Sequence, residues 1–107
     1  MADTPKRLAG PVALATAPAT VYTVPIGRTV VVRHMHIANE TSAGVTFTVS
    51  IGTDGAGKRL YHQVPLAAAA SLDWSGFLVL AAGESLQAYA SGAASVSFVA
   101  SGVEISP

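Results

Sequence analysis

The stretch Val45-Thr46-Phe47-Thr48-Val49-Ser50-Ile51 decides the fold class of this chain. Apolar residues occupy every second position, and hydroxyl side chains occupy the positions between them. A β-strand sends alternate side chains to opposite faces, whereas a helix would scatter this pattern around its axis. The stretch therefore predicts a half-buried strand. Residues typical of turns bracket it on both sides, at Glu40–Gly44 and at Thr53–Gly57.

Working outward, the same signals recur at the spacing of an antiparallel sandwich. Gly76 and Gly102 lie inside predicted strands, where a glycine indicates a bulge or a bend. Leu66–Ala70 has high helix propensity but is too short for a stable helix, so it is predicted to be a connection. The further strands are expected at residues 20–24, 29–39, 59–64, 71–80, 86–90 and 95–105.

The segment from 1 to 18 stands apart because it is interrupted by Pro5, Pro11 and Pro18. It is predicted to be either an extended N-terminal arm or an edge strand. Residues 19–107 are predicted to form a single all-β domain, an antiparallel β-sandwich of jelly-roll type with about seven to nine strands. A chain of 107 residues has room for one hydrophobic core, and without cysteine no disulfide can support it.

Charged residues are unusually scarce, at 11% of the chain against about 25% in an average domain. Because free monomers keep more surface charge, much of this surface is expected to be covered by other subunits. A poorly soluble protein is the alternative. No basic stretch suggests nucleic acid as a partner, and no apolar run approaches the ~20 residues that cross a bilayer.

Two predicted strands are apolar on both faces, at Val30–Val32 and Phe77–Leu80. A strand of this kind needs a cover over its second face. Either the core is locally thick or another subunit provides the cover. On the second interpretation, the predicted oligomer interface consists of Val30, Val32, Phe77 and Val79.

The histidines are the weak candidates for a metal site. His34 and His36 lie two residues apart on one predicted strand and share a face, and His62 could supply a third nitrogen. The simpler interpretation places Met35 and Ile37 in the core, which turns both histidines outward. No metal ion or cofactor is therefore predicted.

Catalytic groups are not recognisable in the sequence. The serines lack a G-x-S-x-G elbow, and the six acidic residues are dispersed instead of paired as glycosidases require. Asp73 beside Trp74 is compatible with a carboxylate near a sugar-stacking ring. A buried Trp74 with Asp73 in solvent is the simpler interpretation. The chain is predicted not to be an enzyme.

The glycine-rich stretch Gly52–Lys58 differs from a phosphate-binding loop, because Arg59 follows Lys58 and no helix follows. It is predicted to be an exposed hairpin tip. Lys58, Arg59 and Tyr61 are candidates for contact with a partner surface or a glycan, and a solvated turn is the alternative.

Glu104 is an acidic residue in an otherwise apolar closing strand. A carboxylate in such a strand needs a charged partner, and Arg28 and Arg33 are the candidates. Arg33 shares its strand parity with Met35 and Ile37, which places it near the edge of the core.

From 7 to 105 the chain resembles a group of small bacteriophage virion proteins. The resemblance is carried by strand, turn and core motifs at Ala19–Arg28, His36–Thr41, Leu80–Leu86 and Ser101–Ile105. It implies a β-sandwich in the phage particle, most closely a capsid decoration (cement) protein. The alternative is a head-fibre or tail component that binds a host receptor or a surface glycan.

The same resemblance implies a homo-oligomer, often a trimer, that contacts other virion proteins such as the major capsid protein. The expected location is the virion, after synthesis in the cytoplasm of the bacterial host. No catalytic residue is carried over. The expected assembly buries apolar strand faces, and the N-terminal arm fastens neighbouring subunits.

Overall fold

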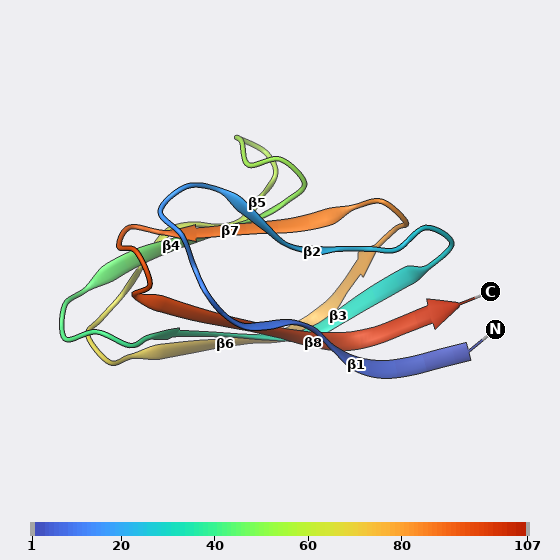
Figure 1. Cartoon of the computed structure of the whole chain (residues 1–107), viewed down its shortest axis with the longest axis horizontal. Coiled ribbons are helices and arrows are strands. Elements are labelled where there is room, and N and C mark those ends of the chain that lie inside the picture. Colours follow the sequence, from blue (N-terminus) through green and yellow to red (C-terminus); the bar gives the residue numbers. More distant parts are fainter. Residues whose placement is uncertain (1, 107) are drawn as a thin grey trace.

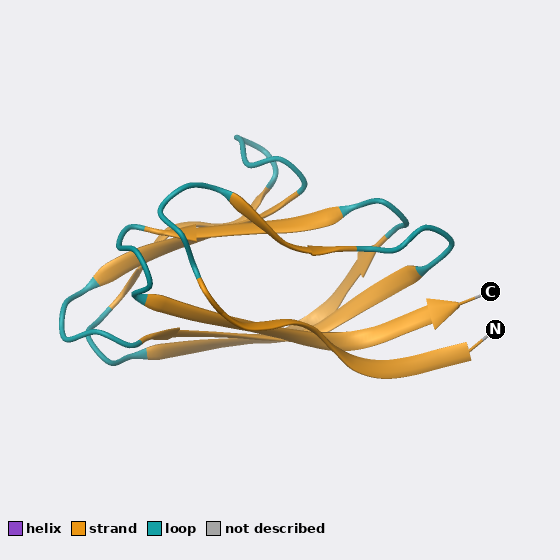
Figure 2. Ribbon diagram, viewed as in Figure 1, coloured by secondary structure: helices purple, strands orange, loops and turns teal. Residues whose placement is uncertain are grey.

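A computed structural model describes residues 2–106, and this part of the chain is a two-layer β-sandwich (Figures 1 and 2). The all-β prediction is confirmed. The eight strands of the described residues are β1 (Ala2–Ala13), β2 (Ala19–Thr23), β3 (Thr29–Asn39), β4 (Val45–Ile51), β5 (Arg59–Leu66), β6 (Ser71–Leu80), β7 (Ser85–Ala90) and β8 (Val96–Ser106).

Each layer is a four-stranded antiparallel sheet. Sheet A has the strand order β1-β8-β3-β6, and sheet B has the order β2-β7-β4-β5. The chain is therefore a long ribbon of strand pairs, in which β1 pairs with β8, β2 with β7, β3 with β6 and β4 with β5. Successive pairs alternate between the two sheets, which is the topology of a jelly roll.

The N-terminal segment is an edge strand over residues 2–13, where β1 pairs with β8 along its length. Ala2 is opposite Ser106, so the two ends of the described chain lie side by side (Figure 1). β5 continues past Pro65 to Leu66, which a strand at the edge of a sheet tolerates. The connection at Leu66–Ala70 contains turns and no helix, as expected.

The core lies between the two sheets and follows the alternation seen in the sequence. On β4, Phe47 and Val49 point inward and are buried. The other large, fully buried apolar side chains are Val24, Val30, Val32, Met35, Ile37, Leu80, Leu86, Val96 and Phe98. Asn39 is a buried polar residue whose side-chain amide donates to the carbonyls of Ala43 and Leu66 at 2.7 and 3.1 Å, which joins the turn after β3 to the end of β5.

A β-bulge at Arg33 changes which side chains of β3 face the core. Val32 pairs with Gly102 and His34 with Ser101, so Arg33 is an extra residue in β3 relative to β8. One extra residue moves every preceding side chain to the other face. Val30 and Val32 consequently point into the core and are 0% exposed, so the prediction that they form an oligomer interface is wrong. Arg33 is exposed and does not lie at the core edge.

Candidate assembly surface

An apolar row crosses the outer face of sheet A. Pro5 pairs with Val103, Val103 with Val31, and Val31 with Val79, so the row takes one residue from each strand in the order β1, β8, β3 and β6. Val31 is only 6% exposed because residues of the row flank it on both sides, whereas Val79 is 53% exposed at the sheet edge. We call Pro5, Val103, Val31 and Val79 the apolar row.

Phe77 extends this row on β6 and is 69% exposed. It lies at the irregularity opposite Arg33, next to Gly76, where the predicted bulge is confirmed. Arg33 donates from Nε to the Gly76 carbonyl at 3.0 Å, and its guanidinium carbon lies 5.6 Å from the centre of the Phe77 ring. A cation over the ring face holds Phe77 on the outside of the sheet.

The histidine pair lies on the same outer face, one row further along the strands. His36 Nδ1 donates to Asp73 Oδ1 at 2.6 Å, and His34 Nε2 donates to the same oxygen at 3.1 Å, since an ionised carboxylate only accepts. The hydrogen bond from His36, reinforced by the contact with His34, holds the pKa of Asp73 below its ordinary value of 3.8. Both histidines face away from the core, as expected.

Asp73 is exposed, and Trp74 beside it is half-buried against the core. The indole ring lies over Gly76: a side chain there would approach its Cζ2 atom to 2.9 Å. Trp74 therefore serves as packing for sheet A and does not stand beside Asp73 as a free stacking surface.

The structure does not bring His62 to the histidine pair. His62 is on β5 in sheet B, whereas His34 and His36 are on the outer face of sheet A. Within one chain, His34, His36 and His62 therefore do not form a common site. Among residues 2–106, no group of three or more His, Cys, Asp or Glu side chains is placed to hold a metal ion.

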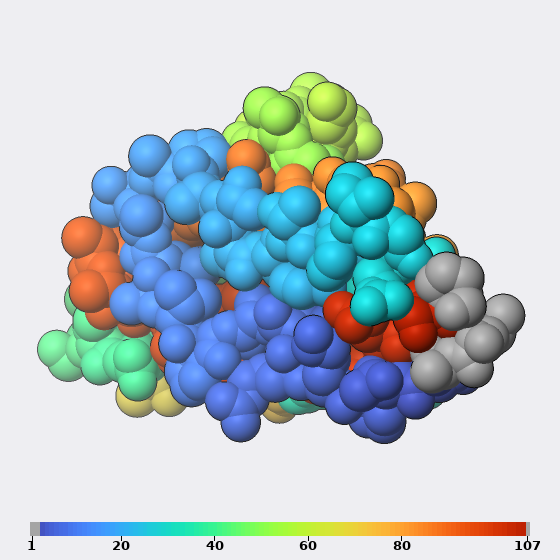
Figure 3. Space-filling view, turned by 45° about the vertical axis from the view of Figure 1, so that its right-hand side comes forward, coloured from blue at the N-terminus to red at the C-terminus, as the bar shows by residue number. Residues whose placement is uncertain are grey.

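The predicted partner or glycan contacts lie at the β4–β5 hairpin, which stands above sheet B (Figure 3). Lys58 is exposed, but Arg59 is held by Asp54 through two hydrogen bonds of 3.0 and 3.2 Å. Tyr61 packs edge-on against Phe47, with 5.4 Å between ring centres. Two of the three candidates are therefore committed to contacts within the chain.

Arg59 and Asp54 belong to a polar network on the outer face of sheet B. The hydrogen bond from Arg59 holds the pKa of Asp54 below its ordinary value of 3.8, and Ser50 also hydrogen-bonds Asp54. Gln87 accepts from the Asp54 backbone amide at 3.1 Å. This network could not be predicted from the sequence, because Gln87 of β7 is far along the chain from the hairpin that carries Ser50, Asp54 and Arg59.

A cleft of about 670 Å³ opens beside this hairpin. Its lining includes Lys58, Arg59 and Glu84, and none of its lining residues is aromatic. The cleft therefore offers charge and backbone groups to a ligand but no ring for stacking.

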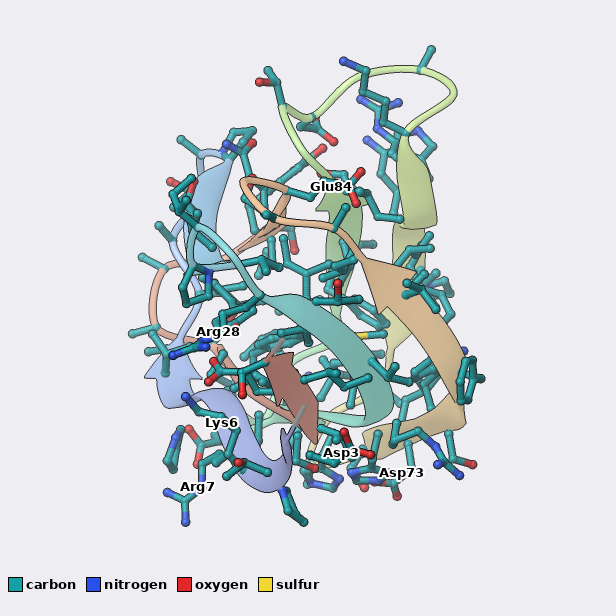
Figure 4. All side chains as sticks on the ribbon, turned by 90° about the vertical axis from the view of Figure 1, so that its right-hand side faces the viewer. Asp3, Lys6, Arg7, Arg28, Asp73 and Glu84 are labelled. Atoms are coloured by element: carbon teal, nitrogen blue, oxygen red, sulfur yellow. The ribbon has the colours of Figure 1, made fainter. Side chains whose placement is uncertain are left out.

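Glu104 is paired as expected with Arg28, at 3.8 Å, but not with Arg33. Its closer partner is Lys6 of β1, at 3.3 Å. Figure 4 shows Lys6 and Arg28, the two cationic partners, near each other. Burial, and secondarily the charge of Glu104, raise the pKa of the nearby Tyr22. Lys6 was missed because the pairing of β1 with β8 joins opposite ends of the chain.

No family model, no curated protein and no solved structure matches the chain. Within residues 2–106 there is no helix that could cross a membrane. The fold and surface define a jelly-roll sandwich with one apolar outer face, and that face is the basis for proposing a function.

Proposed function

We propose that this chain is a non-enzymatic structural protein of a bacteriophage virion, most closely a capsid decoration protein. The observation that carries the proposal is the apolar row, extended by Phe77, on the outer face of sheet A. Pro5, Phe77 and Val79 expose apolar surface on this face, and contiguous apolar patches on a protein surface mark sites of association. In this role, sheet A binds copies of the chain or the major capsid protein.

Two further properties support the proposal. Jelly rolls are a common architecture of viral capsid domains. The chain has only 11% charged residues and no net charge, which suits a subunit whose surface is largely covered after assembly.

The virion role is tested by mass spectrometry of purified phage particles produced from the genome that encodes the chain. We expect the chain in stoichiometric amounts relative to the major capsid protein, and we expect antibody labelling on the outside of the head. If the chain is missing from washed particles and found only in the lysate, the proposal is wrong.

The alternative, a fibre or tail component that binds a surface glycan, is favoured by the cleft beside the β4–β5 hairpin. Lys58 is its exposed basic group. Glycan-array binding that is lost in Lys58→Ala and kept in Phe77→Asp would favour this alternative over assembly through sheet A.

A further inference from the structure

We propose that the outer face of sheet A binds the same face of a second copy, around a two-fold axis parallel to the strands. This inference rests on the proposed assembly role and specifies its partner and geometry. Three properties of the face carry it: the order of residues in the apolar row, the placement of charge at its two edges, and its area.

When the strand order is reversed in the second copy, each apolar residue of the row lies over another apolar residue. A rotation about an axis along the strands places β1 of one copy over β6 of the other, and β8 over β3. Pro5 then lies over the second copy's Val79, and Val103 lies over its Val31. The pairing is isologous, the commonest symmetry of homo-oligomers, and it covers the exposed Val79 in both copies.

The charges at the edges of the face are complementary under the same rotation. Arg7 is on the β1 edge and Asp73 is on the β6 edge, and Figure 4 shows them at opposite sides of one face. Arg7 registers with Ser101, His34 and Ser75, so rotation places it over the second copy's Ser75. Asp73 is two residues from Ser75, about 7 Å along the strand, which is within reach of an arginine.

Both groups have capacity left for this contact. Arg7 is exposed and makes no ion pair within residues 2–106. Asp73 binds both histidines through Oδ1, so Oδ2 is available to a second-copy guanidinium. A charge-assisted arginine–carboxylate contact at each edge would fix the register of the pair.

The area is sufficient for a specific but modest dimer. At ordinary strand spacing and rise, the outer side of sheet A measures roughly 20 by 30 Å. Two such faces would bury on the order of 1,200 Å² in total, at the lower end of the range for specific interfaces. The expected dissociation constant is micromolar, so the dimer should depend on protein concentration.

The test is a charge exchange read by light scattering behind a sizing column. We expect the wild-type chain to have the mass of a dimer at high concentration. Arg7→Asp alone and Asp73→Arg alone place like charges together at both edges, and each should weaken the dimer about tenfold or more. An equimolar mixture of the two variants should form a heterodimer, because each contact again joins one arginine to one aspartate.

Lys58→Asp is the matched control for Arg7→Asp, since it makes the same change of charge on the other side of the sandwich and should leave the dimer unchanged. If Asp73→Arg does not fold, Ser75→Arg places a cation opposite Arg7 and gives the same test. A wild-type trimer, a monomer at every concentration, or single variants that the mixture does not rescue would each overturn the two-fold pairing. A trimer, or presence in purified particles, would leave the virion role standing.

Discussion

The outward residues of the two sheets differ in polarity and in exposure. On sheet B, the outward residues Thr48 and Ser50 are polar yet only 1% exposed. The chain itself satisfies them, since the Gln63 amide donates to Thr48 Oγ1 and Ser50 bonds to Asp54. On sheet A, the outward Phe77 and Val79 are apolar and more than half exposed. The chain itself satisfies the outward polar groups of sheet B, whereas the outward apolar residues of sheet A are the surface to which we assign a partner in the proposed function.

The largest effect on stability should come from a substitution at Gly102, where β8 and β3 of sheet A lie very close together. A methyl group on Gly102 would lie 2.0 Å from the Val31 carbonyl oxygen, so Gly102→Ala must push β8 and β3 apart. We expect a loss of about 3 kcal/mol in the free energy of unfolding, measured by urea denaturation. Gly55→Ala in the hairpin above sheet B meets no atom within 4 Å and should change stability by less than about 0.5 kcal/mol.

Phe77→Asp and Val79→Asp should separate assembly from folding. Both side chains are more than half exposed in the single chain, so the melting temperature should move by less than about 4 °C. A carboxylate in the apolar strip should raise the dissociation constant of self-association about tenfold or more. Thr53→Asp, exposed in the hairpin above sheet B, is the control that should associate normally. Unchanged masses for both sheet A variants would remove the main support for a partner-covered face.

Asp54→Asn should loosen sheet B without affecting sheet A. The change removes the ionic part of the contact with Arg59 that holds the hairpin to the sheet. Trypsin cleavage after Lys58 should become several-fold faster, because cleavage requires local opening of the loop. Asp3→Asn on β1 changes the same charge elsewhere and should not alter the rate. Equal cleavage rates in all three proteins would mean that the ion pair does not restrain the hairpin.

The smallest effect concerns acid stability. The pKa values of Asp73 and Asp54 are both lowered from 3.8 in the folded chain, so each ionised group stabilises the fold above about pH 4. That contribution is lost as pH falls through the lowered folded pKa. Asp73→Asn and Asp54→Asn should therefore each make the acid part of the stability–pH curve shallower, measured by urea unfolding between pH 2 and 6. A slope identical to that of the wild type would contradict the hydrogen-bond origin of the shift.

The strands could be predicted from the sequence because their alternation is local. Val45–Ile51 was located to the residue, and the turn residues gave the remaining boundaries within a few positions. Which valines of β3 face the core could not be predicted. Val30–Val32 is a run of three valines, so either phase buries valine, and nothing local shows that Arg33 is the extra residue. Gly76 and Gly102 were the available signals, and both lie directly beside Arg33 on the neighbouring strands.

Residues of the assembly surface could be predicted only where their exposure follows from the pattern of a single strand. Phe77 and Val79 lie on a strand that is apolar on both faces, and both are exposed; their part in an oligomer interface stays a prediction. Pro5 and Val103 were missed because they join the apolar row through the register of β1 with β8. The sequence predicts Arg59 as a contact for a partner or a glycan. It does not show the hydrogen bond to Asp54, because that bond depends on how the hairpin folds back.

The strand pairing also determines when the outer face of sheet A can be completed during synthesis. β4 and β5 are neighbours in the sequence, whereas β1 pairs with β8, which is synthesised after the other seven described strands. Until β8 arrives, β1 has no partner and the central Val103 is absent from sheet A. If the apolar row mediates association as proposed, a nascent chain cannot associate through it before β8 has been synthesised.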